Sequence, residues 1–295
     1  MQIWYGNSNW SIQHANDLQL GQYFFDWVIK TVDTYQDFLR SNLTFTLASH
    51  FRDTSLAGQS LYVDPVAGFI NALLPVVKEK LDSVLSQIGQ EPNLLSQIVK
   101  EIFSFDQTVR DKFNYDGGNG EQGWKGLSWE VLDKWFPEWS QVEKRFALKR
   151  YQEIIKAPNS GDIDYDGAPI GKTKATYGAG QVTDLIATVT TTYNRLRKFA
   201  QRVMFLIDIQ AEILDQYLGR LNDSLESYQS MTSAVGRTLH GVTREQQASL
   251  EGVGGLRSLC KVFGSAEHMV SMLKEWSNEE ASDILNVLSS KLINL

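Results

Sequence analysis

Apolar residues recur at intervals of three and four along most of the chain, and this spacing places them on one face of an α-helix. The first such run consists of Leu20, Phe24, Trp27, Thr31, Tyr35 and Phe38. Beyond it, Asn42–Phe51 alternates between apolar and polar residues, as many strands do. Because helical patterns lie on both sides, we favour a helix for this segment. The N-terminal region is therefore predicted to be helical.

Two further helices are predicted before residue 116. The first spans the apolar run from Ile70 to Ile88, and Pro75 is expected to bend or delay it. The second contains the apolar positions from Leu95 to Val109 and follows a break at Gln90–Asn93. Asn93 is a residue type that suits a helix N-cap, so we expect the helix to begin there.

Asp116–Gly120 is the clearest linker, since it is an unbroken run of turn-forming residues. A chain of 295 residues is longer than one typical domain, so two packed units are expected. We therefore predict an N-terminal helical bundle over residues 1–116 and a second bundle over residues 117–295.

The second bundle is predicted to contain several helices and one long loop. Pro137 is expected to open its first long helix, because proline is tolerated in a first turn. Lys156–Tyr177 is rich in Pro, Gly, Asp and Asn and is predicted to be a loop. Helical periodicity returns over Gln181–Tyr228, where a turn near Asn194 would divide it. Shorter helices are expected at Leu256–Phe263, His268–Trp276 and Ala281–Leu292.

The bulk composition narrows the classes of function. The net charge of −7 argues against broad nucleic-acid binding, which needs clustered Lys and Arg. Cys260 is the only cysteine, which excludes an internal disulfide and a thiolate metal cluster and suits a reducing compartment. The start of the chain does not resemble a signal peptide. The apolar pattern continues to Leu295 without a cap, so we expect a piece of a longer protein.

Membrane insertion is not expected from this sequence. The most apolar segments, Phe69–Val77 and Val203–Ile209, are far shorter than the roughly 20 residues of a membrane-spanning helix. We therefore predict a soluble protein that reaches membranes only through its partners.

Two overlapping segments resemble ligand-binding loops. Asp162–Gly167 copies the opening of an EF-hand calcium loop, but the twelfth position, where a bidentate Glu belongs, holds Thr173. Gly167–Thr173 resembles a phosphate-binding loop, yet it has three residues between its glycines where that motif has four, and the negative Asp166 adjoins it. A calcium- or nucleotide-regulated adaptor that uses Asp162–Thr173 stays open as an alternative.

No catalytic constellation stands out in the sequence. The four histidines show no pair at metal-ligand spacing, and no nucleophile motif occurs. We predict no catalytic residues, no metal site and no cofactor. A modest basic cluster is the candidate partner-binding patch, and it consists of Arg195, Arg197, Lys198 and Arg202. Such a cluster suits an acidic partner helix or acidic lipid head groups, or it is a solvated face with Tyr193 and Phe199 in the core.

The segment from Phe136 to Ile155 resembles the signature helix of the RINT/TIP family. A second match follows in order over Lys172–Ala175, Phe205–Gln210 and Asp215–Leu221. The positions that carry the resemblance are Trp139, Phe146, Tyr151, Ile155, Phe205, Asp208, Gln210 and Tyr217. Aromatic residues at helical spacing are most simply core residues, so we expect these positions to serve packing rather than binding.

The resemblance implies an all-α protein built from elongated, stacked helical bundles like those of exocyst-type and conserved-oligomeric-Golgi-type tethers. It implies a non-enzymatic scaffold in the Dsl/NRZ vesicle-tethering complex, which acts in Golgi-to-ER retrograde transport. The expected partners are the N-terminal domain of an ER SNARE and sister tether subunits. The expected location is cytoplasmic and peripheral on the endoplasmic reticulum membrane. For some members the family name also implies a nuclear checkpoint adaptor, which stays open as an alternative.

Overall fold

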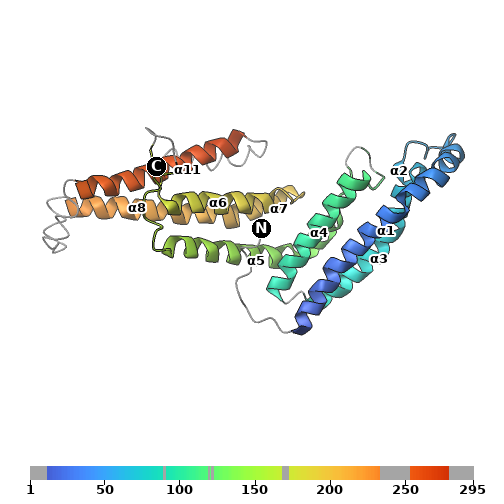
Figure 1. Cartoon of the computed structure of the whole chain (residues 1–295), viewed down its shortest axis with the longest axis horizontal. Coiled ribbons are helices and arrows are strands. Elements are labelled where there is room, and N and C mark those ends of the chain that lie inside the picture. The colour runs from blue at the N-terminus through green and yellow to red at the C-terminus, as the bar shows by residue number, and fades with distance from the viewer. Residues whose placement is uncertain are drawn as a thin grey trace. The chain divides into compact units, whose positions relative to one another are not determined.

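A computed structural model describes residues 12–88, 91–118, 120, 123–167, 173–232 and 253–278. Every regular element in these ranges is helical, apart from one isolated bridge between Ile163 and Thr176 (Figure 1). The predicted all-α class is therefore confirmed. None of the described helices combines the length and apolar character that crossing a membrane requires. The helix expected at Ala281–Leu292 lies outside the described residues.

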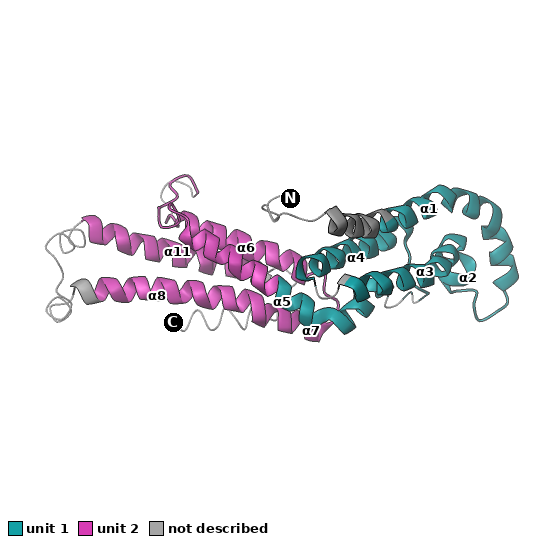
Figure 2. Cartoon of the chain, turned by 90° about the horizontal axis from the view of Figure 1, so that it is seen from below, with its two compact units in different colours: residues 1–142 teal, residues 143–295 magenta. Residues whose placement is uncertain are grey.

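The chain forms two compact units, Met1–Val142 and Glu143–Leu295, shown in separate colours in Figure 2. The division falls inside one helix, α5 (Leu127–Lys156), which contributes residues to both units. The predicted bundles, 1–116 and 117–295, stay a prediction.

The first unit is built from helices that lie side by side in Figures 1 and 2. Its helices before α5 are α1 (Ile12–Phe51), α2 (Ser60–Val63), α3 (Pro65–Ile88) and α4 (Pro92–Phe113). Asn42–Phe51 belongs to α1, so the helix favoured for this segment is confirmed. Helix α4 begins at Pro92 with Glu91 as its N-cap, so the N-cap predicted at Asn93 is wrong. Proline suits that first position because its missing N–H would have no partner there.

Helix α1 buries a different face from the one that the apolar periodicity marks. From residue 24 onward its buried side chains are Phe25, Val28 and Val32. The Phe25 ring packs against that of Phe105 with centroids 4.9 Å apart. Trp27 and Phe38, which belong to the marked face, are 57% and 63% exposed. The helix therefore has two apolar faces, of which one packs into the first unit.

Helix α5 is continuous through Pro137, which lies inside it rather than at its start. The prediction that this proline opens the helix is therefore wrong. The helix begins ten residues earlier, at Leu127, because a buried carboxylate caps it there. Asp106 of α4 accepts hydrogen bonds from the backbone N–H groups of Leu127 and Ser128, at 2.8 and 2.9 Å. This cap comes from a helix far away in sequence, which local patterns do not reveal.

The second unit contains the rest of α5 and the helices that follow it. These are α6 (Tyr177–Tyr193), α7 (Phe199–Phe205), the π-helical segment η1 (Leu206–Ala211), α8 (Glu212–Thr232) and α11 (Val253–Asn278). Helix α11 lies against α6 and α8 (Figure 1). The predicted loop at Lys156–Tyr177 and the turn near Asn194 are both confirmed by the bounds of α5, α6 and α7. The two helices expected between Leu256 and Trp276 form the single helix α11.

Candidate functional site

The turn between α6 and α7 carries the basic cluster that the sequence predicts as a partner-binding patch. Helix α6 ends with its C-cap at Asn194, and Lys198 is the N-cap of α7. The side chains of Arg195 and Arg197 are exposed in this turn, and Lys198 is half-buried. The turn therefore exposes two guanidinium groups to solvent.

Arg202 belongs to the predicted cluster in sequence, but its side chain is half-buried. Its guanidinium lies over the Tyr193 ring, 4.7 Å from the ring centroid, and its Nε is buried. Tyr193 is itself buried at 2% exposure, as expected for a core residue. Arg202 therefore packs α7 onto α6 through a cation–π contact, and the exposed charge comes from the turn.

Phe199 was expected in the core, but the structure places it on the surface with 71% of its side chain exposed. Met204 and Ile207 on the same segment are 54% and 58% exposed. We name these three residues together with Arg195, Arg197 and Lys198 the α7 patch. The α7 patch contains both apolar and cationic side chains. Aromatic and Arg residues are enriched at protein interfaces, so this composition suits a binding surface.

The π-helical segment η1 explains why apolar side chains are found on both sides of this region. A π-bulge adds one residue to a turn and shifts the faces of the helix that follows. Leu206, Ile209 and Gln210 are buried, whereas Ile207 between them is exposed. The Gln210 Nε2 donates a 2.6 Å hydrogen bond to Thr190 Oγ1, which fastens η1 to α6. Sequence periodicity assumes a regular helix and therefore missed the exposure of Ile207. The exposure of Phe199 and Met204, which precede η1, was also not predicted.

Most of the residues that carry the family resemblance lie in the cores of the units. Trp139 is fully buried, with its ring edge-on to Phe103 in the first unit. Tyr151, Phe205, Gln210 and Tyr217 are also buried. Phe146, Ile155 and Asp208 are half-buried. Burial raises the pKa of Tyr217, whose hydroxyl bonds to Ser265 and Thr176 and so ties α8 to its neighbours.

The long loop between α5 and α6 is held tightly on α11. We name its described residues, 157–167 and 173–176, the strap. Thr176 bonds to Ser265 through its backbone N–H and its hydroxyl, at 3.3 and 3.0 Å. Lys261 pairs with Asp162 at 3.7 Å. The Thr176 hydroxyl also accepts the Ala179 N–H and caps α6. The strap is therefore part of the packed second unit.

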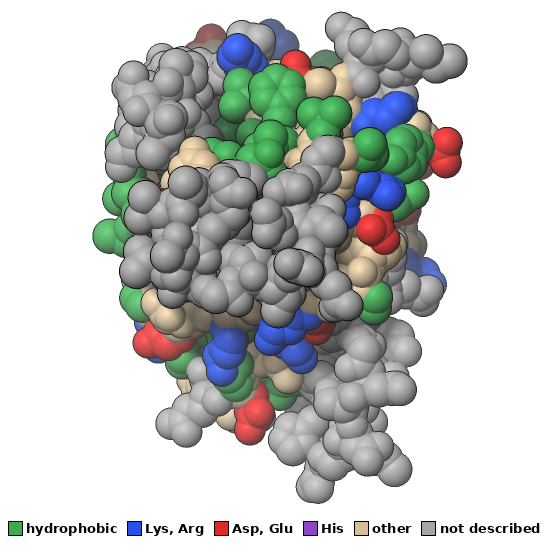
Figure 3. Space-filling model, turned by 90° about the vertical axis from the view of Figure 1, so that its left-hand side faces the viewer, with side chains coloured by type: hydrophobic (Ala, Val, Ile, Leu, Met, Phe, Trp, Pro, Cys, Tyr) green, Lys and Arg blue, Asp and Glu red, His purple; other side chains and the backbone are tan. Residues whose placement is uncertain are grey.

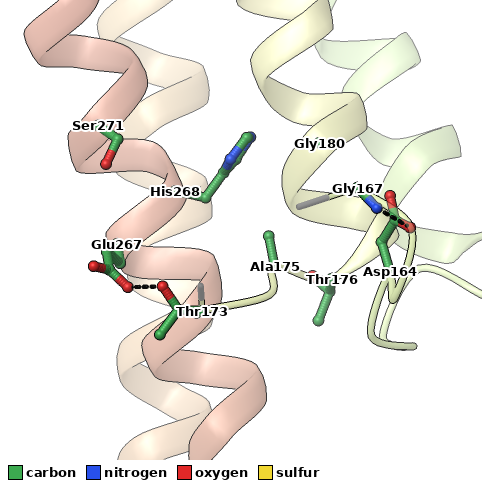
Figure 4. A pocket seen from close by; sticks show the side chains of 10 residues that line it. Asp164, Gly167, Thr173, Ala175, Thr176, Gly180, Glu267, His268 and Ser271 are labelled. Carbon is green, nitrogen blue, oxygen red and sulfur yellow. Dashed lines mark hydrogen bonds between the residues drawn. The ribbon is translucent and has the colours of Figure 1, made fainter. Parts of the chain in front are cut away.

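A cavity of about 290 Å³ lies between the strap and α11 (Figure 4). Glu267, His268 and Ser271 line it from α11, and Thr173 donates a hydrogen bond to Glu267 across its mouth. Asp164, on the strap side, accepts the backbone N–H groups of Asp166 and Gly167, as in a plain Asx turn. Within the described ranges, no group of three His, Cys, Asp or Glu side chains is arranged to hold a metal ion. Positions 168–172 of the proposed ligand loops lie outside those ranges.

His268, which lines this cavity, makes the stability of the folded chain depend on pH. Burial lowers the pKa of His268, while the charge of Asp184 raises it less, and the ring bonds to Thr183 at 3.1 Å. A lowered pKa means that the folded chain binds the proton less tightly than the unfolded chain does. The contribution is therefore present above the unfolded pKa of about 6.5 and is lost as the pH falls through the folded pKa.

Replacing His268 by glutamine is therefore expected to weaken the loss of stability on acidification. The melting temperature of the wild type should fall more between about pH 7.5 and pH 5 than that of His268→Gln. The exposed His50→Gln is the matched control and should follow the wild type. Equal pH dependence of wild type and His268→Gln would contradict the assignment.

Charges of both signs are mixed on the face drawn in Figure 3. Lys and Arg side chains alternate there with Asp and Glu, and hydrophobic side chains gather in the upper part of the view. The described side chains in this view therefore show no field of a single sign. The excess of cationic groups in the α7 patch is therefore a local feature of a chain whose net charge is −7.

Comparison with known proteins gives one family. The sequence model of the RINT-1/TIP-1 family matches residues 10–281. The RINT1-like protein of Drosophila melanogaster is 22% identical over 177 residues, which cover 60% of this chain. The matched part spans about a quarter (24%) of the length of that relative. No solved structure matches the chain.

Proposed function

Because the chain belongs to the RINT-1/TIP-1 family, we propose that it is a non-enzymatic scaffold of a vesicle-tethering complex. It would act in Golgi-to-ER retrograde transport as part of a Dsl/NRZ-type complex, together with sister tether subunits. Its location would be the cytoplasmic side of the endoplasmic reticulum, where partners hold it at the membrane. The alternative of a calcium- or nucleotide-regulated adaptor gains no support from the described part of the strap.

The observation that carries the proposal is that the residues of the family resemblance and the exposed residues have different roles. The positions that carry the resemblance serve mainly the packing of helices, as a rigid scaffold requires. The α7 patch adds exposed apolar and cationic side chains of the kind that a scaffold presents to a partner. Its exposed Phe199 offers an apolar anchor of the kind that dominates binding energy at interfaces.

We assign the α7 patch to an acidic surface on the N-terminal domain of an ER SNARE. Arg195 and Arg197 are exposed and stand within four residues of the exposed Phe199 in the sequence, so a partner that carries Asp or Glu around an apolar pocket would complement all three. Arginine suits this role because its planar guanidinium bonds to a carboxylate with two N–H groups.

The test is a pull-down of purified ER SNARE N-terminal domains on this chain. We expect the wild type to retain the domain and the double variant Arg195→Glu/Arg197→Glu to lose it. Arg202 is left unchanged, since its contact with Tyr193 makes any reversal a folding variant. The matched control is Arg145→Glu/Lys149→Glu, a reversal of two exposed cations on α5. Retention by the patch variant would refute the α7 patch as the docking site, and no retention by the wild type would place SNARE binding outside this chain.

A further inference from the structure

Helix α1 carries a row of aromatic side chains that the first unit leaves uncovered. Trp27, Phe38 and Phe45 are 57%, 63% and 81% exposed, although the opposite side of the same helix is packed. Single exposed apolar residues are common on protein surfaces, but a row of large ones usually marks an interaction site.

These aromatic residues follow a regular spacing along α1. Alternate steps of three and four residues, the spacing of a helix–helix seam, connect eight positions. The positions are Phe24, Trp27, Thr31, Thr34, Phe38, Ser41, Phe45 and Ala48, which we name the α1 seam. At 1.5 Å per residue the α1 seam is about 36 Å long. Its shape therefore suits a second helix that lies along it.

Removing the α1 seam from water costs little free energy of desolvation. None of its eight side chains is charged, and its threonines are already bonded to the backbone of α1. Thr31 Oγ1 donates to the Trp27 carbonyl at 2.8 Å, and Thr34 Oγ1 donates to the Lys30 carbonyl at 2.7 Å. Because these hydroxyl groups keep their bonds when a partner covers them, burial leaves few donors unsatisfied.

The charges beside the α1 seam indicate the chemistry of the partner. Lys30 and Asp37 are both exposed, stand seven residues apart and therefore occupy the same flank. Asp33, farther round the helix, already pairs with Lys112 of α4 at 2.8 Å. A complementary helix would place an acidic residue at Lys30 and a basic residue at Asp37.

A second copy of this chain fits the α1 seam less well. In a parallel pair the small residues Thr31, Thr34 and Ser41 would face their own copies and leave gaps. In an antiparallel pair that aligns Trp27 with Phe45, the two copies of Asp37 would meet near the twofold axis, where like charges repel. Each self-pairing therefore carries a cost that a different helix avoids.

We propose that the α1 seam binds an amphipathic helix of another protein. That helix has uncharged apolar residues at alternating steps of three and four, and it carries one acidic and one basic residue seven positions apart on one flank. This surface belongs to the first unit, and its assignment does not depend on the role proposed for the α7 patch.

Site-specific photo-cross-linking in cells that express the full chain tests the proposal. We expect p-benzoylphenylalanine at position 38 or 45 to cross-link to a helix of another protein with the stated pattern. The same group at Arg40, which faces away from the α1 seam, should not. The cross-linked segment, made as a synthetic peptide, should bind the purified chain and lose on the order of tenfold or more in affinity for Phe38→Glu/Phe45→Glu.

Three results would overturn the proposal. They are no cross-link at either position, a cross-link within the same chain, and a cross-link to a second copy. The melting temperature gives an independent check, because exposed residues contribute little to folding. An unchanged melting temperature of Phe38→Glu/Phe45→Glu supports a docking surface, whereas a marked drop would mean that the chain covers the α1 seam itself.

Discussion

Replacing Asp106 by alanine is expected to lower the free energy of unfolding of the first unit by about 3 kcal/mol. Its carboxylate is 1% exposed and accepts the backbone N–H groups of Leu127 and Ser128. Alanine would leave both donors buried without an acceptor, at a cost of roughly 1–3 kcal/mol each. Urea unfolding followed by circular dichroism measures the change.

The exposed Asp111→Ala on the same helix is the matched control for this substitution. It removes the same side chain from a solvated position and should change stability by no more than about 0.5 kcal/mol. Asp106→Asn should lie between the two, because its amide keeps one acceptor oxygen and loses the other. If Asp106→Ala proved as harmless as Asp111→Ala, the cap would not hold the start of α5.

Replacing Gly264 by alanine is expected to destabilise the second unit by about 1–3 kcal/mol, the usual cost of overpacking a filled interior. A Cβ atom at this position would overlap the backbone carbonyl oxygen of Lys174 in the strap. A backbone atom cannot swing aside as a flexible side chain can, so either the strap or α11 must move. Thermal unfolding measures the change.

We expect the opposite effect on stability from Gly219→Ala in α8, which serves as the control. A Cβ atom there meets nothing within 4 Å, and alanine is about 0.5–1 kcal/mol more favourable than glycine inside a helix. We therefore expect Gly219→Ala to raise the melting temperature and Gly264→Ala to lower it. A gain for both would mean that the strap does not rest on α11 as described.

Local sequence signals sufficed to predict the elements and some of their limits. The run of Pro, Gly, Asp and Asn after Lys156 predicted the strap, and Thr176 then caps α6 by a purely local hydrogen bond. A turn near Asn194 was likewise predicted, as a division of the long helical stretch from Gln181 to Tyr228. These features depend on residues close together in sequence, whose conformational preferences act whatever surrounds them.

Features set by distant contacts were not predictable in this way. Apolar spacing identified α1 but marked its exposed face, because the residues that pack against Val28 and Val32 come from other helices. Pro137 was placed at a helix start because the cap from Asp106 lies 21 residues away from Leu127. Phe199 was expected in the core. Its exposure depends on how the turn after α6 orients the first residue of α7, and the sequence does not reveal that orientation. Tertiary packing decides such positions, and one sequence does not contain its geometry.

The positions that carry the family resemblance have a different role from the candidate surfaces. Trp139, Tyr151 and Tyr217 are buried and fix how the helices pack. The α1 seam belongs to the first unit and the α7 patch to the second. Because their residues are largely exposed, they can be altered with little effect on folding. The two surfaces can therefore be tested separately by substitution.

Calorimetric titration of the purified chain with an ER SNARE N-terminal domain tests the docking role of the α7 patch most directly. We predict one domain bound per chain, with an affinity that falls as salt screens the charges. The Kd should rise on the order of tenfold or more for Arg195→Glu/Arg197→Glu, equivalent to about 1.4 kcal/mol, and stay unchanged for Arg145→Glu/Lys149→Glu. An unchanged Kd for the patch variant, or no binding by the wild type at low salt, would contradict this role.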